Sequence, residues 1–145
     1  MVIESFEPTA VFRKTKDGSY FTFCPEVAGV ASEGHTLEEA RTMIKEALEG
    51  VIEVVLERDF PDYFKAAGKK ILRGDIVEKI DIDKKLQVAV SIRMARERAG
   101  LTQAQLAEKL GIKQQHISRY EKGIVVPSAD RFLQLFEILK PILTH

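Results

Sequence analysis

The sequence lacks several features that would place it in a common class of proteins. Its 145 residues include one cysteine, Cys24, which excludes an internal disulfide framework and a zinc site built on cysteines. Its histidines, His35, His116 and His145, lie too far apart for metal-ligand spacing. No apolar run approaches the ~18 residues of a membrane span, and residues 1–20 show no export signal. We therefore expect a cytoplasmic protein without metal, cofactor or membrane contact.

A net charge of zero hides an asymmetry between the two halves of the chain. Residues 1–83 contain 11 basic and 17 acidic side chains, whereas residues 84–145 contain 11 basic and 5 acidic side chains. A basic segment suits a polyanion such as DNA, and an acidic segment suits a basic protein. We predict two domains, 1–83 and 84–145, with different partners.

The first half begins with strand patterns and continues with a helix. Residues 9–14 and 19–23 are rich in β-branched and aromatic residues and flank Asp17-Gly18, which is typical of a hairpin turn. A short third strand is predicted at 30–32. Thr36 and Glu39 form a capping box, and apolar residues recur at helical spacing up to residue 57.

The remainder of the first half predicts one more strand. Residues 58–75 contain proline, glycines and charges, so we interpret them as a connector. At 76–82, Ile76, Ile80 and Ile82 would lie on one side of a fourth strand. The predicted order of elements in this domain is βββαβ.

The second half shows helical patterns and no further strand pattern. We predict helices at 84–99, 103–110, 114–122 and 129–139. The predicted fold class is therefore α+β, with the βββαβ domain followed by an all-α domain.

Residues 102–123, TQAQLAEKLGIKQQHISRYEKG, have the spacing of a helix-turn-helix. Thr102 and Gln105 form a capping box that fixes the start of a short helix, and Gly111 ends that helix because glycine tolerates a left-handed backbone. Apolar or small residues fall at the inward positions of both helices: Leu106, Ala107, Leu110, Ile117 and Tyr120. A plain helical hairpin is the alternative, but the pattern favours DNA binding.

The outward residues of the second helix have the chemistry of base recognition. A glutamine can bond adenine through two hydrogen bonds and an arginine can do the same with guanine. We therefore expect Gln114, Gln115 and Arg119 to contact bases, with Ser118 on the same exposed side. For His116 a base contact and a packed or solvent-facing position remain open.

Other polar residues of the motif suit the phosphate backbone. Gln103 begins the first helix, where its side chain and the backbone N–H groups can meet a phosphate. Lys113 and Lys122 are expected to add phosphate contacts. Since one recognition helix covers only a few base pairs, we expect a homodimer or a higher even oligomer on palindromic double-stranded DNA.

Residues 92–139 resemble the DNA-binding domains of Cro and phage repressors. The resemblance rests on the whole stretch TQAQLAEKLGIKQQHISRYEKG. One departure is Lys113, where many members have Ser or Thr to cap the recognition helix. Lysine cannot accept the capping hydrogen bond.

Residues 11–55 are similar to the HicB antitoxin family. The similarity rests on DGSYFTFCPEVAG, then SEGHTLEEA, then a helix containing KEAL, all followed by a repressor-type domain. This resemblance implies a partial ribonuclease H-like front domain without nuclease activity. It also implies a type II antitoxin that neutralises HicA, a small mRNA-cleaving toxin, and represses its own operon.

The residues themselves argue against nuclease chemistry. A metal-dependent nuclease needs several carboxylates converging on a cation, one of them from a central strand. The first two predicted strands contain no acidic residue, and Glu78 and Asp81 would lie on opposite faces of the fourth. We expect no catalytic residues.

An acidic row is predicted along the long helix. Glu46, Glu49, Glu53 and Glu57 follow one another at spacings of three and four residues, without an interleaved base on that face. The row is either a solvated face or a surface for a basic partner, for which the resemblance supplies HicA. Cys24, next to Pro25, is expected to be a small buried side chain.

Two other functions remain as alternatives to a type II antitoxin. One is a stand-alone transcriptional regulator whose N-terminal domain dimerises or senses a ligand, and nothing in the sequence excludes it. The other is a ribonuclease H-type enzyme with an added DNA-binding domain, which the placement of carboxylates disfavours.

Overall fold

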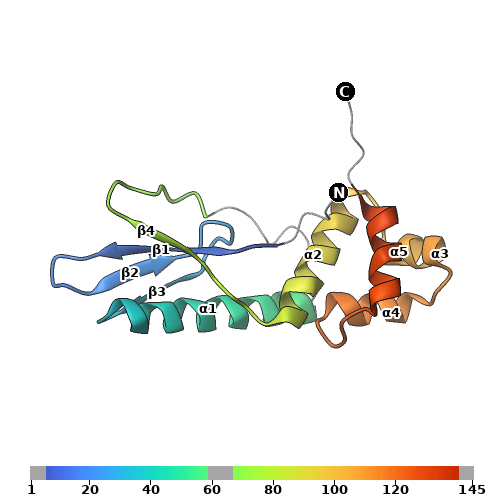
Figure 1. Ribbon diagram of the computed structural model, residues 1–145, viewed down its shortest axis with the longest axis horizontal. Coiled ribbons are helices and arrows are strands. Elements are labelled where there is room, and N and C mark those ends of the chain that lie inside the picture. Colours follow the sequence, from blue (N-terminus) through green and yellow to red (C-terminus); the bar gives the residue numbers. More distant parts are fainter. Residues whose placement is uncertain (1–5, 59–66, 141–145) are drawn as a thin grey trace, which may run out of the picture. The chain divides into compact units, whose positions relative to one another are not determined.

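A computed structural model describes residues 6–58 and 67–140 and divides the chain into two compact units (Figure 1). The front unit comprises residues 7–83, and the helical unit comprises Phe6 together with the residues from Lys84 onward. Phe6 joins the helical unit because its N–H donates to Ser91 Oγ at 2.8 Å, and its carbonyl accepts from Gln87 Nε2 at 3.0 Å. The prediction that the domains 1–83 and 84–145 have different partners stays a prediction.

The front unit is an antiparallel sheet with one helix. Its elements are β1 (Thr9–Lys14), β2 (Tyr20–Phe23), β3 (Ala31–Gly34), α1 (Leu37–Arg58) and β4 (Ile76–Lys79). The strand order is β3-β2-β1-β4, with each neighbouring pair antiparallel. The predicted βββαβ order and the α+β fold class are thereby confirmed.

One face of the sheet packs on α1 through an apolar side of the helix. The Thr36 hydroxyl accepts the N–H of Glu39 at 3.0 Å and fixes the start of α1. The buried helix residues recur at helical spacing: Ala40, Ile44, Leu48, Ile52, Val55 and Leu56. At the end of β3, a Cβ on Gly34 would lie 2.6 Å from the Ala40 nitrogen, so glycine permits this close approach.

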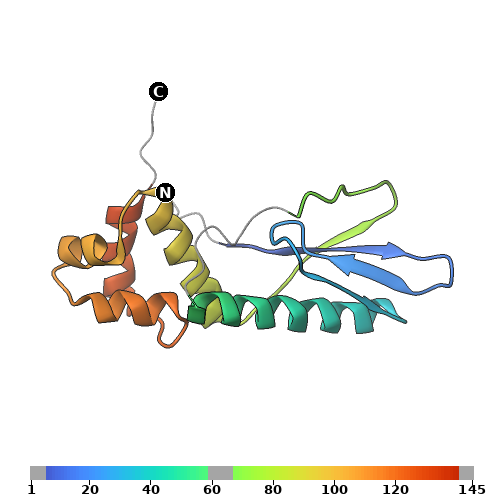
Figure 2. The same ribbon diagram turned by 180° about the vertical axis from the view of Figure 1, so that it is seen from behind.

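The opposite face of the sheet is crossed by residues 67–75 (Figures 1 and 2). The N–H of Ala67 donates to the Pro25 carbonyl at 2.8 Å. The Lys69 ammonium lies over the rings of Phe21 and Phe23, at 5.1 and 5.5 Å from their centroids. These contacts hold the segment against the aromatic side of β2.

Two arginine–carboxylate pairs fasten the end of this segment and β4 to the unit. Arg13 donates through Nε and Nη2 to the two oxygens of Asp75, at 2.9 and 2.8 Å. Arg41 on α1 donates in the same way to Glu78, at 2.8 and 2.7 Å. The hydrogen bonds from these arginines lower the pKa of both carboxyl groups below their usual values.

Two strand predictions need correction. The third strand begins at Ala31 instead of residue 30, because Val30 closes a turn by accepting the N–H of Cys24 at 3.1 Å. The fourth strand ends at Lys79, and Ile76 is 38% exposed instead of facing the core. As β4 is at the edge of the sheet, it has a neighbour on one side within the described residues, which leaves its apolar side chains partly uncovered.

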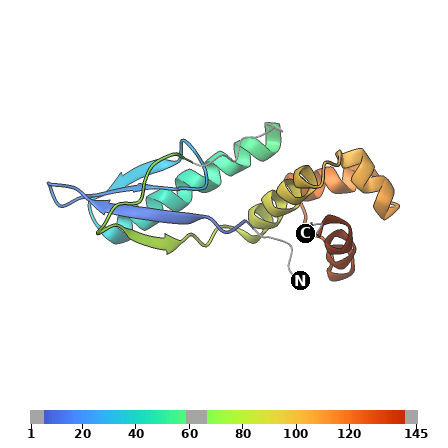
Figure 3. The ribbon, with the colours of Figure 1, turned by 90° about the horizontal axis from the view of Figure 1, so that it is seen from above.

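The helical unit contains α2 (Lys84–Arg98), α3 (Gln103–Leu110), α4 (Gln114–Glu121) and α5 (Ala129–Leu139), seen from another direction in Figure 3. Residues from all four helices form its core: Ile92, Ala95, Leu106, Ala107, Ile117, Tyr120, Leu135 and Leu139. The predicted helices agree with these bounds to within one residue. Among the described residues, no helix has the length and apolar character that crossing a membrane requires.

Candidate nucleic-acid interface

The start and end of α3 follow the predicted signals. The N–H of Gln105 donates to Thr102 Oγ1 at 3.0 Å, and the N–H of Thr102 donates to Gln105 Oε1 at 2.9 Å, so the capping box is complete. Gly111 has φ 68° and ends the helix in the left-handed conformation. The N–H of Ile112 returns to the carbonyl of Ala107 at 3.0 Å. This cap turns the chain into α4 within three residues.

The recognition helix α4 begins at a lysine. Lys113 occupies the N-cap position with an extended backbone, φ −77° and ψ 147°. Among the described residues no side chain caps α4, as expected because Lys113 stands where many Cro and phage repressor domains have Ser or Thr. The N–H of His116 donates to the carbonyl of Lys113 at 3.1 Å, so it is the N–H groups of Gln114 and Gln115 that can meet an external acceptor such as a phosphate oxygen.

The two sides of α4 differ in burial. Ile117, Tyr120 and Glu121 are buried against the rest of the helical unit. The predicted contact residues lie on the other side, where Ser118 is half-buried and the others are exposed: Lys113, Gln114, Gln115, His116, Arg119 and Lys122. The structure thus gathers two amides, one guanidinium and two ammonium groups at a single surface. Their contacts with DNA stay a prediction.

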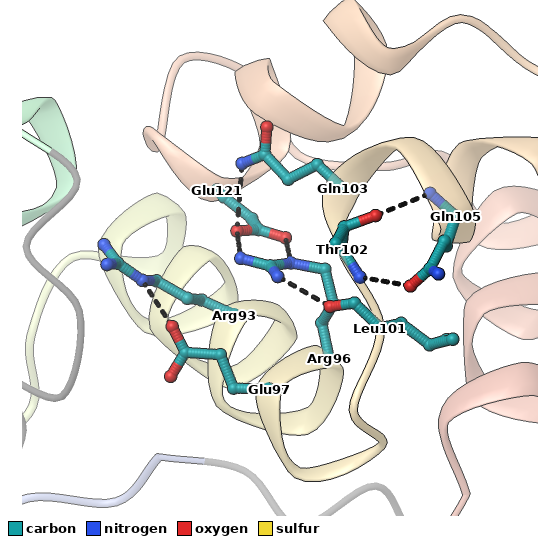
Figure 4. Close-up of polar contacts among 8 residues, drawn as sticks. All are labelled: Arg93, Arg96, Glu97, Leu101, Thr102, Gln103, Gln105 and Glu121. Carbon is teal, nitrogen blue, oxygen red and sulfur yellow. Dashed lines mark hydrogen bonds and ion pairs between the residues drawn. The ribbon is translucent and has the colours of Figure 1, made fainter.

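A buried ion pair ties α4 to α2 (Figure 4). Arg96 Nε donates to Glu121 Oε2 at 2.7 Å, and Arg96 Nη2 donates to Glu121 Oε1 at 2.9 Å. Arg96 Nη1 also donates to the carbonyl of Leu101 at 2.8 Å. The bidentate pair fixes the end of α4 relative to α2 and to the turn before α3.

Gln103 joins the same cluster. Its Nε2 donates to Glu121 Oε1 at 3.2 Å, and the residue is half-buried (Figure 4). The side-chain amide therefore points toward Glu121, and a phosphate contact through it would compete with this hydrogen bond. The predicted phosphate role of Gln103 stays a prediction.

Arg96 and Glu121 position α4, a role that was not predicted from the sequence. Glu121 lies four residues after Ile117, and Arg96 lies four residues after Ile92, so both fall on apolar helix faces. A charged residue on the inward face of an amphipathic helix signals a buried partner, because an unpaired buried charge is strongly unfavourable. Arg96 and Glu121 both show this signal, but the helical pattern does not identify the partner of either residue.

The acidic row of α1 is not uniform. Glu46, Glu53 and Glu57 are exposed, as predicted for either of the two interpretations. Glu49 is half-buried, and its Oε2 accepts the N–H of Asp83 at 2.9 Å. Glu49 therefore also has a structural role, which the sequence analysis did not predict.

Cys24 is a buried thiol, and the described carboxylates do not gather into a metal-binding cluster. Cys24 is fully buried, as predicted, and desolvation raises the pKa of its thiol to about 11, so the thiol is protonated at neutral pH. Across residues 6–58 and 67–140, no three His, Cys, Asp or Glu residues come together where they could hold a metal ion.

Two family models match the chain, one in each unit. Residues 8–62 match the UPF0150-like family, and residues 92–141 match a helix-turn-helix family. The second match covers α3, Gly111 and α4, which carry the geometry described above.

Known proteins are similar to both parts of the chain. A UPF0150 protein of Synechocystis sp. is 37% identical over 51 residues, 35% of this chain and 71% of that protein. Antitoxin HicB 1 of Photorhabdus laumondii is 28% identical over 120 residues, 81% of this chain and 72% of that protein. The crystal structure of Burkholderia pseudomallei antitoxin HicB matches 73% of this chain and 96% of its own, at 17% identity and a TM-score of 0.47. The chain belongs to the UPF0150 family and is a HicB-family antitoxin homologue with a helix-turn-helix domain.

Proposed function

We propose that this protein is a type II antitoxin with two separate binding functions. The helical unit binds operator DNA and represses the protein's own operon, and the front unit binds and neutralises a HicA-type, mRNA-cleaving toxin. The proposal is carried by the helix-turn-helix of α3, Gly111 and α4 placed behind a UPF0150 segment. The relative from Photorhabdus laumondii, named as an antitoxin, spans both parts.

DNA binding is supported by the exposed side of α4. Gln114, Gln115 and Arg119 project from consecutive turns and carry the groups that read adenine and guanine edges in the major groove. Lys113 and Lys122 stand at the two ends of the helix, where they suit flanking phosphates. The buried Arg96–Glu121 pair holds this helix in one orientation, which base recognition requires.

Toxin binding is supported by the charge of the front unit. A toxin that cleaves RNA must attract a polyanion and is therefore expected to be basic. Glu46, Glu53 and Glu57 form an exposed acidic row that could attract it and accelerate association. Neutralisation by occlusion needs no catalysis, and we assign none to this chain.

The first test is a tagged pull-down of the full chain from its host, with mass spectrometry of the bound proteins at moderate salt. Recovery of a small basic protein in stoichiometric amount, whose toxicity this chain suppresses on co-expression, is the expected result. Recovery of DNA without such a protein would contradict the antitoxin function and leave a stand-alone transcriptional regulator.

Paired variants then separate the two binding functions. Glu53→Lys with Glu57→Lys should impair toxin binding and leave operator affinity unchanged. Glu49 is left intact because it also bonds the Asp83 backbone. An unchanged toxin affinity in this variant would show that the acidic row is only a solvated surface.

A further inference from the structure

The front unit has an exposed apolar seam on the outward side of α1. Met43, Gly50 and Val54 are separated by seven and four residues, so they lie on one side of the helix, away from its buried residues. Met43 is 39% exposed and Val54 is 46% exposed. Glu46, Glu53 and Glu57 run beside them. We call these six residues the α1 seam.

Gly50 is unusual at the centre of this seam. It lies in the interior of a 22-residue helix, where glycine is less favourable than alanine. A Cβ built at this position would meet no described atom within 4 Å, so packing inside the chain does not require glycine here. Without a side chain at position 50, the helix backbone between Met43 and Val54 is open to another segment.

A second exposed apolar patch of the front unit is flanked by basic residues. Residues 69–73 read Lys-Lys-Ile-Leu-Arg, and all five are exposed. Ile71 and Leu72 are 53% and 52% exposed. The neighbouring acidic residue, Asp75, is bound by Arg13 through two hydrogen bonds. We call residues 69–73 the basic segment.

The seam and the basic segment lie on opposite sides of the sheet. The α1 helix covers one face of the sheet, and Lys69 lies over the Phe21 and Phe23 rings on the other face. The two patches therefore cannot meet within one front unit. One copy of the chain can present both of them to other copies.

We propose that the basic segment of one copy docks on the α1 seam of a second copy. Ile71 and Leu72 would cover Val54 and the helix backbone at Gly50, removing apolar surface from water. Lys70 and Arg73 would lie against the acidic row, which fixes the orientation of the contact. Exposed ion pairs alone contribute little, so the apolar residues supply most of the affinity and the charges supply the specificity.

This inference goes beyond the proposed function and does not depend on it, because it concerns the chain alone. A basic toxin bound to the acidic row would compete with the second copy for the same surface. Failure of the self-association test would leave DNA and toxin binding untouched.

The test is analytical ultracentrifugation of the full chain and two charge-reversed variants in the absence of toxin and DNA. The first variant is Glu46→Lys with Glu53→Lys, and the second is Lys70→Glu with Arg73→Glu. Each variant alone should associate about tenfold more weakly than the wild type, since like charges would then face one another. An equimolar mixture of the two should regain the association, because the reversed seam then meets the reversed segment.

A matched control reverses two lysines of the β1–β2 hairpin. Lys14→Glu with Lys16→Glu makes the same change in net charge as Lys70→Glu with Arg73→Glu, at exposed positions outside both patches, and should associate like the wild type. Any association through the helical unit is common to all samples and cancels in the comparison. The proposal is overturned if the wild type lacks this association step, if the two variants retain it, or if their mixture does not regain it.

Discussion

Both units use arginine–carboxylate pairs, but at different depths. In the front unit, the arginine side chains of the pairs Arg13–Asp75 and Arg41–Glu78 are 33% and 48% exposed, and their carboxylate partners are 3% and 32% exposed. In the helical unit, the side chains of Arg96 and Glu121 are 10% and 3% exposed. The hydrogen-bond geometry is similar in the three pairs, since each arginine donates to both oxygens of its partner.

This difference in depth predicts different consequences of breaking the pairs. Water can solvate an arginine released near the surface, so the front unit should tolerate the loss of a carboxylate partner. A charge left alone in the interior has no such compensation. The Arg96–Glu121 pair that holds the recognition helix should therefore be needed for the stability of the helical unit. Such a rigid contact suits a helix that must keep one orientation on DNA.

The largest effect is expected for Arg96→Ala. It leaves Glu121 buried without its main partner, and we expect a loss of about 3–5 kcal/mol in the free energy of unfolding of the helical unit. Urea denaturation followed by circular dichroism measures this loss. The double variant Arg96→Met with Glu121→Leu should recover most of it, because neither charge of this pair then remains in the interior. Equal destabilisation by the double variant would contradict this explanation.

The next effect concerns DNA binding and not stability. Arg119 is exposed on α4, so Arg119→Ala should leave the thermal midpoint unchanged. Operator affinity should fall by about 1–3 kcal/mol and discrimination at one base pair should relax. Fluorescence anisotropy with matched and single-substituted operators measures both. A loss that is equal for all sequences would reassign Arg119 to a phosphate contact.

A smaller effect is expected at the turn between the two helices. Gly111 has φ 68°, where an L-residue with a Cβ is disfavoured, although a Cβ there would meet no described atom within 4 Å. Gly111→Ala should therefore cost about 1–2 kcal/mol from backbone strain alone. Gly50→Ala in α1 is a control with the opposite expected sign. It should stabilise the chain, because alanine is more favourable than glycine inside a helix. A neutral Gly111→Ala would show that the turn can relax.

The smallest effect is expected for Asp75→Asn in the front unit. Arg13 lowers the pKa of Asp75 in the folded state, so the carboxylate stabilises the fold above its unfolded-state pKa. This contribution is lost as the pH falls through the lower, folded-state pKa. Thermal melts should therefore show a small difference between the variant and the wild type at neutral pH and none in strong acid. A difference that persists in acid would point to lost packing.

Local signals in the sequence predicted most of the architecture. The capping residues Thr36 and Thr102 and the helix-ending Gly111 act within one turn of the chain, so their effects can be deduced without knowing the tertiary structure. The bounds of α3 and α5 agree with the prediction. The third strand was predicted close to its observed position, but its first residue depends on the hydrogen bond from the Cys24 N–H to the Val30 carbonyl, which the sequence does not reveal.

Contacts between distant residues could not be predicted in the same way. Arg96 and Glu121 are 25 residues apart, and Glu49 meets the Asp83 backbone across 34 residues. Helical periodicity shows which side of a helix such residues occupy, but it does not identify their partners. The hydrogen bond from Gln103 to Glu121 could not be predicted from the sequence either, because it depends on how α3 packs against α4. The predicted phosphate contact of Gln103 was therefore made without knowledge of this bond.

The central claim is that the two units bind different partners independently. The most direct measurement compares toxin neutralisation, as growth rescue on co-expression with the toxin, between the wild type and Arg119→Ala at equal protein levels. The variant's weakened operator binding is verified on the same preparation. We predict full rescue by a variant that binds its operator more weakly than the wild type does. Loss of rescue together with loss of DNA binding would contradict the division of function between the two units.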